Sequence, residues 1–353
     1  MKKFLLFAFL AVFGCASELI ESIKKGDTYK FDEIIAKKPD FSVLDESGYS
    51  ACDLAILHKE SFYSEVFFAD LLKANGCVKG KNDDKVLNIF YDLLASKEPD
   101  LKGVDLNKNL PSGLKIIHLA SIFAKKEQIK SLVDNGADIK ALAPKDEDRE
   151  TADDCLYYAA RYNQNEGMIE YLADKGFDLN KTYFHGSALI QASRHGNLRA
   201  AEELINKGAD IHASTPVGGS AFTFLAGFKG SSELLKKLAK MGAELNAGID
   251  GFGGNALDRA VLDSDDFEVV DTLLALGAGD KDEVLCILAV AAKDGKMIDY
   301  LVGLGAKLND DCDEEDFMFG SEDLSIERLE WLEKNSKIKI SDKLRKEALS
   351  PKN

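Results

Sequence analysis

The sequence has no excess of positive charge and no catalytic motif. Its 45 Lys and Arg residues are outnumbered by 61 Asp and Glu residues, which gives a formal net charge of −16. Nucleic acids and anionic membrane surfaces both attract Lys and Arg, so binding to either class of partner is disfavoured. The sequence contains no Gly-x-Ser-x-Gly, no phosphate-binding glycine loop and no His-Glu-x-x-His. We therefore expect no catalytic residue and no enzymatic activity.

Cysteine and histidine patterns that bind metals are also missing. None of the six cysteines forms a Cys-x-x-Cys pair or a Cys/His cluster, and the five histidines are scattered. We expect no metal site and no cofactor. If Cys15 carries a lipid, the other five cysteines allow at most two disulfides, and only Cys52 and Cys77 share one structural unit. We interpret most of them as small core residues. The five are Cys52, Cys77, Cys155, Cys286 and Cys312.

One long apolar run, Phe4 to Phe13, lies near the N-terminus and is too short to span a bilayer. Two lysines precede it and three small residues follow it, the order that is typical of a secretory signal peptide. We expect residues 1–16 to be this signal. Its end resembles a bacterial lipobox, in which Cys15 would become the lipidated first residue; cleavage after Ala16 is the alternative. The protein is expected to be exported to the periplasm, either soluble or lipid-anchored.

Beyond this segment, one short phrase is repeated along the chain. The phrase is Gly-Ala-Asp or a variant of it and closes a pair of short amphipathic helices, and its copies follow one another at steps of 40, 32, 34, 35 and 28 residues. A period of this size is typical of a repeat architecture, in which each unit buries its apolar face against the next. The copies begin at Gly136, Gly176, Gly208, Gly242, Gly277 and Gly305.

A second recurring feature is the start of the first helix in each unit. The opening residues are Ser50, Lys115, Asp154, Ser187, Ser220, Asn255 and Cys286. The pattern is degraded between Asn82 and Leu110, where two short helices are readable, Val86 to Phe90 and Tyr91 to Leu94, and no Gly-Ala ending follows. We interpret this stretch as a degenerate repeat.

These features resemble an ankyrin-repeat protein. The best local match is Ser187-Ala188-Leu189-Ile190-Gln191-Ala192, followed by Gly208-Ala209-Asp210. The resemblance implies an all-α repeat solenoid of helix-turn-helix units joined by short hairpin loops, with about seven recognisable repeats, a degenerate repeat and irregular caps. It also implies that the imidazole of His118 ties backbone groups together. The expected single domain covers residues 17–347, with caps at 17–45 and 313–347, the degenerate repeat at 82–110, and a tail at 348–353.

The resemblance further implies that a partner binds to hairpin tips and to the inner ends of the first helices. Aromatic and Arg residues at these positions are types enriched in binding hot spots. The expected partner-binding residues are Phe123, Arg161, Tyr162, Tyr183, Phe184, Arg194, His195, Val217, Phe228 and Phe252.

Two functions are consistent with this pattern. The first is a monomeric, non-enzymatic protein–protein interaction module of the bacterial envelope, whose acidic surface favours a basic partner. The alternative is a haem- or metal-handling accessory protein in the periplasm, which would use His185, His195 or a free cysteine.

Overall fold

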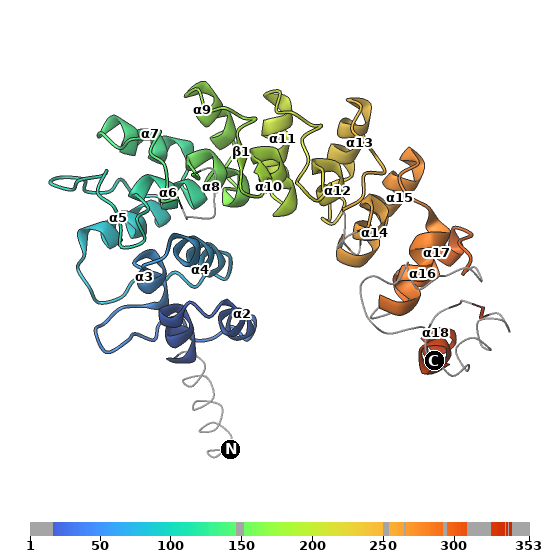
Figure 1. Ribbon diagram of the computed structural model, residues 1–353. Coiled ribbons are helices and arrows are strands. Elements are labelled where there is room, and N and C mark those ends of the chain that lie inside the picture. The colour runs from blue at the N-terminus through green and yellow to red at the C-terminus, as the bar shows by residue number, and fades with distance from the viewer. Residues whose placement is uncertain are drawn as a thin grey trace, which may run out of the picture. The chain divides into compact units, whose positions relative to one another are not determined.

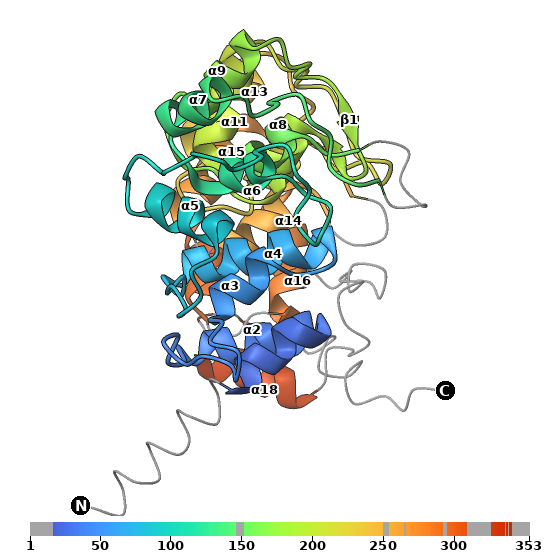
Figure 2. The same ribbon diagram turned by 90° about the vertical axis from the view of Figure 1, so that its left-hand side faces the viewer.

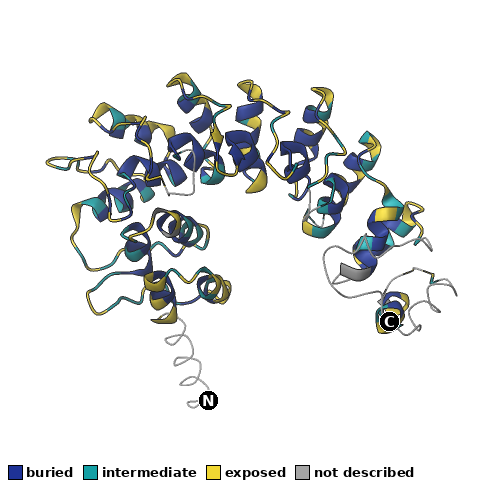
Figure 3. Ribbon diagram, viewed as in Figure 1, coloured by how far each residue is buried: buried dark blue, intermediate teal, exposed yellow. Residues whose placement is uncertain are grey.

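The computed structural model describes residues 17–145, 152–249, 254–264, 266–291, 295–308, 326–335, 337 and 339–340. The chain divides into two compact units, unit 1 at residues 1–178 and unit 2 at residues 179–353. Both units consist mainly of short paired helices (Figure 1). Buried residues line the sides of the helices that face one another, and exposed residues gather at the helix ends and loops (Figure 3).

In unit 1, first helices pack side by side, and each second helix packs against its own first helix. The pairs α6 with α8, α6 with α7, and α8 with α9 follow this rule (Figure 1). Unit 1 contains a helical segment at residues 17–25, α2 (Thr28–Ala36), α3 (Ala51–Ile56), α4 (Ser61–Lys73), α5 (Lys85–Leu94), α6 (Ile116–Phe123), α7 (Lys126–Asp134), α8 (Cys155–Tyr162) and α9 (Met168–Asp174).

Unit 2 has the same plan, and the β1–β2 hairpin projects away from its helices (Figure 2). Two further hairpins are closed by the bridges Ser214–Ser220 and Ile249–Gly254. Unit 2 contains β1 (Thr182–Tyr183), β2 (Gly186–Ser187), α10 (Ala188–Arg194), α11 (Leu198–Asn206), α12 (Ala221–Leu225), α13 (Ser232–Lys240), α14 (Ala256–Arg259), the π-helical turn η1 (Ala260–Ser264), α15 (Phe267–Leu276), α16 (Lys281–Ala291), α17 (Lys296–Gly303) and α18 (Ile326–Asn335).

Cap residues determine where the first helices begin. Six of the seven expected opening residues are N-caps, namely Ser50, Lys115, Asp154, Ser187, Ser220 and Asn255. All except Lys115 accept a backbone N–H of the first turn through the side chain, a bond worth about 1 kcal/mol. The six glycines of the repeated phrase all have positive φ, between +74° and +98°, so they stop the second helices as expected.

His118 closes the first turn of α6 in place of a cap side chain. Its Nδ1 accepts the N–H of Lys115 at 3.1 Å, and its Nε2 donates to the carbonyl of Ala141 at 2.9 Å. Burial lowers the pKa of the His118 imidazole, which favours the neutral form that these two bonds require. The expected backbone-tying role of His118 is therefore confirmed.

The expected helix start at Cys286 is wrong. Helix α16 begins at Lys281, and Cys286 lies inside it. The Asp280 carboxylate accepts the N–H of Asp282 at 2.7 Å and begins the helix directly after the glycine phrase. No hairpin lies between α15 and α16, so the spacing of helix starts in the earlier repeats does not predict the start of α16.

The degenerate repeat has one helix, α5, instead of the two short helices expected. After α5 the backbone stays non-helical up to α6. The carbonyl of Leu93, near the end of α5, accepts a hydrogen bond from the side-chain amide of Gln128 at 2.8 Å. This repeat also has an ending, contrary to expectation. Gly103 has a φ of +72°, and the phrase Gly103-Val104-Asp105 contains Val where other copies have Ala or Phe.

Asparagine side chains join successive repeat endings within each unit. Asn107 accepts the N–H of Asp138 at 2.8 Å and donates to the carbonyl of Gly136 at 2.8 Å. Asn180 accepts the N–H of Asp210 at 2.8 Å in the same way, and Asn246 accepts that of Gly279 at 2.8 Å. Because Asn107 makes the same bond as Asn180 and Asn246, residues 103–107 form a repeat ending of the same kind as the others.

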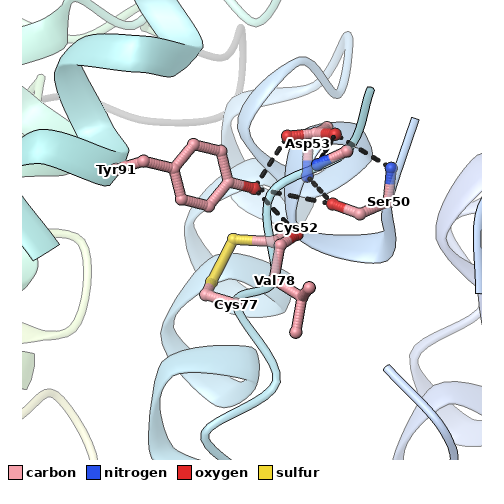
Figure 4. The surroundings of a disulfide bond; sticks show 7 residues. Ser50, Cys52, Asp53, Cys77, Val78 and Tyr91 are labelled. Carbon is pink, nitrogen blue, oxygen red and sulfur yellow. Dashed lines mark hydrogen bonds between the residues drawn. A yellow bond between two sulfur atoms is a disulfide. The ribbon is translucent and has the colours of Figure 1, made fainter. Parts of the chain in front are cut away.

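A disulfide joins Cys52 of α3 to Cys77 after α4 (Figure 4). Beside it, the buried Asp53 carboxylate accepts the N–H of Gly80 at 3.0 Å and the hydroxyl of Tyr91 at 2.7 Å. Residue 80 must be glycine, because a Cβ there would lie 2.1 Å from the Asp53 carboxylate. Disulfide and carboxylate together hold residues 77–80 against α3.

Three of the cysteines in the described part of the chain are disulfide-bonded, more than the interpretation of most of them as simple core residues allows, although Cys52 and Cys286 are also buried in the core. Cys52 and Cys77 are bonded to each other, and Cys286 is also disulfide-bonded. Cys155 is a buried free thiol, as expected. The spacing of cysteines along the sequence does not reveal which Cβ atoms come close enough to bond.

Removing the Cys52–Cys77 cross-link should destabilise α3 and α4. The double substitution Cys52→Ala with Cys77→Ala should lower the free energy of opening of these helices by about 2–4 kcal/mol, because the unfolded chain regains the freedom of the closed loop. Amide hydrogen exchange in α3 and α4 measures this free energy. The control is Cys155→Ala, which removes a buried thiol but no cross-link. Equal protection in the double variant and the control would contradict the prediction.

Candidate functional site

Three of the expected partner-binding residues lie in unit 1, and all three are covered by the chain itself. Phe68 of α4 packs edge-to-face on Phe123, with ring centroids 5.6 Å apart. Glu65, one turn earlier in α4, forms an ion pair with Arg161 and accepts the hydroxyl of Tyr162 at 3.0 Å. The expected exposure of Phe123, Arg161 and Tyr162 is therefore corrected: their side chains face α4.

The Glu65–Arg161 ion pair is almost fully shielded from water. The side chain of Arg161 is 11% exposed and that of Glu65 is 4% exposed. Burial by itself lowers the pKa of Arg161, but the Glu65 carboxylate and the neighbouring phenols outweigh this effect, so the pKa is raised and the guanidinium stays charged. Arg161 also donates to the Tyr157 hydroxyl at 2.5 Å. The pair is thus supported by two tyrosine hydroxyls.

Helix α4 covers these residues because it is apolar on more than one face. Phe67 and Phe68 are adjacent, so they point about 100° apart around the helix, and both are fully buried. Phe67 packs on Phe31 of α2, with ring centroids 4.6 Å apart, and Phe68 packs on Phe90 of α5 as well as on Phe123. A helix that is hydrophobic all round is a buried helix. The two adjacent phenylalanines are the signal in the sequence that could have predicted this covering.

Unit 2 brings three other expected residues together around a hollow of about 650 Å³. Phe184 stands at the tip of the β1–β2 hairpin and is 51% exposed, and Val217 stands at the next hairpin tip and is 47% exposed. Arg194, at the end of α10, is exposed on the helix side. The residues that line the hollow are Phe184, His185, Arg194, Thr215, Pro216, Val217, Phe224, Ile249 and Arg259.

Two arginines flank a single aromatic ring in this hollow. The guanidinium carbon of Arg194 lies 5.9 Å from the centroid of the Phe224 ring, and that of Arg259 lies 5.7 Å from the same centroid. These distances allow cation–π attraction, which holds both cations against the ring. Arg259 also forms a 2.8 Å ion pair with Asp263, one turn later. The described residues that line the hollow include two arginines and no carboxylate, in a chain whose net charge is −16; one of the two arginines, Arg259, is paired with Asp263.

Six residues of the lining are absent from the expected partner-binding residues, although His185 was named for the haem- or metal-handling alternative. The six are His185, Thr215, Pro216, Phe224, Ile249 and Arg259. Phe224 and Arg259 share one repeat position, the fourth residue after the helix-opening residues Ser220 and Asn255. The expected helix residues came from the two positions after each small-residue pair, which lie further along the helix. A comparison of the fourth position between repeats would have selected both side chains.

The remaining expected residues lie outside the hollow. Tyr183 is only 2% exposed, so its expected exposure at a tip is wrong: in β1 Thr182 is exposed and Tyr183 is buried, because neighbouring strand residues point to opposite faces, and Phe184 follows in the turn. Phe228 is half-buried and packs on Gly196, and His195 is exposed but is not part of the lining. Phe252 and Cys15 lie outside the described residues.

The haem- or metal-handling alternative gains no support from this geometry. Within the described part of the chain, no three His, Cys, Asp or Glu side chains come close enough together to hold a metal ion. Cys155, the free thiol, is fully buried, and burial raises its pKa to about 12, so it is neither accessible nor readily ionised.

Removing the carboxylate of Glu65 should destabilise the contact between α4 and α8. Glu65→Ala removes the buried carboxylate that pairs with the Arg161 guanidinium, which costs about 3 kcal/mol or more. Hydrogen exchange of the amides in α4 and α8 measures the loss. The control is Glu202→Ala on α11, an exposed glutamate whose removal should change stability by less than about 0.5 kcal/mol. A Glu65→Ala protein as well protected as the control would contradict the prediction.

Comparison with known proteins bears on the middle of the chain. In the described part of the protein, no helix is both long and apolar enough to cross a membrane. No curated protein matches the sequence. Residues 117–215 match the family model of ankyrin repeats, in three copies. Together with the mostly helical, paired structure, this match fits an all-α repeat fold and supports an ankyrin-repeat protein.

Proposed function

We propose that the mature chain is a non-enzymatic binding module of about seven repeats, which recognises a partner protein through the hollow in unit 2. Ankyrin repeats generally mediate protein–protein interaction, so the matched repeats at residues 117–215 imply a protein partner. The observation that carries the choice of site is the hollow itself, where two exposed apolar hairpin tips lie next to Arg194. Apolar side chains exposed together mark interaction surfaces, and Arg is enriched at their energetic centres.

The hairpin that presents Val217 is ordered before any partner binds. Thr215 accepts the N–H of Gly218 at 2.9 Å through its carbonyl, and its hydroxyl accepts the N–H of Gly219 at 3.0 Å. Thr215 also donates its own N–H to the carbonyl of Gly219 at 2.9 Å. A preformed tip loses little conformational freedom on association, which favours affinity.

We further propose that the protein is exported to a bacterial periplasm, where it is a monomer, either soluble or anchored through a lipid on Cys15. The apolar segment at residues 1–16 has the order of a signal peptide. The disulfides at Cys52–Cys77 and at Cys286 also support export, because structural disulfides form and persist in oxidising compartments. The net charge of −16 favours a partner that is basic overall.

Site-specific photo-crosslinking in the native cell tests the binding site. A photoreactive phenylalanine at Val217 should capture a specific protein, and the same group at the exposed Glu202 of α11 should not. Combining the Val217 probe with Phe184→Ala should reduce capture about tenfold or more, since a truncated hot spot costs at least about 1.4 kcal/mol. Equal capture from positions 217 and 202 would contradict the proposed site.

The mass of the N-terminal peptide from the same purified protein tests export. A lipidated N-terminus at Cys15, or an unmodified one at Ser17, is the expected result. A mature chain that retains Met1 would contradict the proposal of export.

A further inference from the structure

Arg161 and Arg194 occupy the same position in two repeats. Each is the seventh residue after a helix-opening cap, Asp154 in one repeat and Ser187 in the next, and the two arginines are 33 residues apart in the sequence. The structure therefore offers two instances of one site, and their surroundings differ. Arg161 is covered by another part of the chain, whereas Arg194 is exposed at the hollow.

Helix α4 gives Arg161 a ligand of defined chemistry. Glu65 and Phe68 are three residues apart, so they lie on the same face of α4. The Glu65 carboxylate pairs with Arg161, and the Phe68 ring packs on Phe123, the C-terminal residue of the neighbouring first helix α6. Helix α4 thus places a carboxylate and an aromatic ring, one helical turn apart, on the C-terminal ends of the first helices α8 and α6.

The hollow at Arg194 has a cation and apolar side chains that correspond to those around Arg161; its second arginine, Arg259, is also paired with Asp263. No carboxylate of the described residues forms an ion pair with Arg194. Arg259 adds a second cation, and its Nε is buried with no hydrogen-bond partner among the described residues. Apolar walls come from Phe184, Val217 and Ile249, and their low polarity strengthens an ion pair formed beside them.

We infer that the hollow of unit 2 binds a protein segment in which a carboxylate lies about one helical turn from an aromatic or large aliphatic side chain. The inference rests on the proposed function and specifies the chemistry of its partner. The carboxylate is held by the planar guanidinium group of Arg194, which can donate two parallel hydrogen bonds to it, while Arg259, which is also paired with Asp263, adds a second positive charge. The apolar side chain enters between the hairpin tips Phe184 and Val217. The hollow, about 650 Å³, is of ordinary size for a side-chain or ligand pocket, about 300–1,000 Å³.

The side chains that line the hollow include two positively charged arginines, whereas the whole chain is negatively charged. A net charge of −16 attracts a basic partner at long range, but the described lining of the hollow contains two arginines and no carboxylate. A polyanion such as nucleic acid would be repelled by the rest of the surface, whereas a single carboxylate beside an apolar group would not. The expected partner is therefore a protein that is basic overall and contacts the hollow through an acidic, apolar segment.

Four labelled helical peptides test this inference on the mature full chain. They share one Ala/Gln background with blocked ends and differ only in a pair of residues at positions i and i+3: Glu with Phe, Gln with Phe, Lys with Phe, and Glu with Ala. The Glu/Phe peptide should bind about tenfold more tightly than each of the others, because a charged hydrogen bond or a buried ring contributes at least that much. Fluorescence polarisation gives the dissociation constants. Equal binding of the Glu/Phe and Gln/Phe peptides overturns the inference, as does a failure of all four peptides to bind.

Substitution of the arginines assigns the preference to the hollow. The double variant Arg194→Gln with Arg259→Gln should lose the preference for Glu over Gln, while the control Arg199→Gln, an exposed arginine on α11, should keep it. Circular dichroism melting of each variant confirms that it is folded. A preference for Glu that persists in the double variant overturns the inference. Phenylacetate, tested as a competitor, should displace the Glu/Phe peptide only weakly; displacement at concentrations near the peptide's dissociation constant would indicate a small-molecule site and overturn the inference.

The segment captured by crosslinking at Val217 separates this inference from the proposed function. A captured segment that has Asp or Glu within four residues of a large apolar side chain supports both. If position 217 captures a specific protein through a segment without this pair, the inference fails and the proposed function stands. If the peptide preference depends on both arginines but position 217 captures no protein in cells, the chemistry of the hollow is supported and the proposed function fails.

Discussion

The described helices have at most 13 residues, so each is at best marginally stable alone and its apolar faces must be covered by neighbours. Helix α12 has five residues and α14 has four, whereas an isolated helix needs about 12–15 residues in water. Cap side chains begin the helices, glycines end them, and asparagines 107, 180 and 246 join one repeat ending to the next. The inner ends of the first helices remain as the surface that this stacking does not cover. What covers them differs between the two units.

In unit 1 the chain covers that surface itself. Helix α4 is longer than its neighbours and apolar on more than one face, and it places Phe68 on Phe123 and Glu65 on Arg161. In unit 2 the equivalent arginine, Arg194, stays exposed beside two apolar hairpin tips. The same repeat position thus has a structural role in one unit and is available to a partner in the other.

The regular parts of the fold could be predicted because they depend on local sequence. Cap residues such as Ser187 and glycines such as Gly208 fix the ends of helices by interactions within a few residues, and both were predicted. One prediction failed where the repeat changes its form: helix α16 begins directly after Asp280, with no hairpin before it, and not at the expected Cys286. The repeat ending at Gly103 was missed because Val104 stands where Ala or Phe occurs in the other complete copies.

The candidate site could be predicted only in part, because the sequence around a residue does not show whether a distant segment of the chain covers its side chain. Phe184, Val217 and Arg194 were all expected from the sequence and line one hollow, because hairpin tips and helix ends have fixed places in a repeat; that they bind a partner stays a prediction. The covering of Arg161 by Glu65, 96 residues away, depends on how α4 packs, as does the disulfide between Cys52 and Cys77. The adjacent buried residues Phe67 and Phe68 were the available hint that α4 is enclosed.

Hydroxyl-radical footprinting of the folded protein tests most directly whether α4 shields Phe123 of unit 1 from water while Phe184 of unit 2 is exposed. Phe123 and Phe184 have the same intrinsic reactivity, so their relative rates of oxidation, measured by mass spectrometry, report exposure alone. The account predicts that Phe184 is oxidised several times faster than Phe123. Equal rates, or faster oxidation of Phe123, would show that α4 does not cover unit 1 and would contradict the distinction between the two arginine sites.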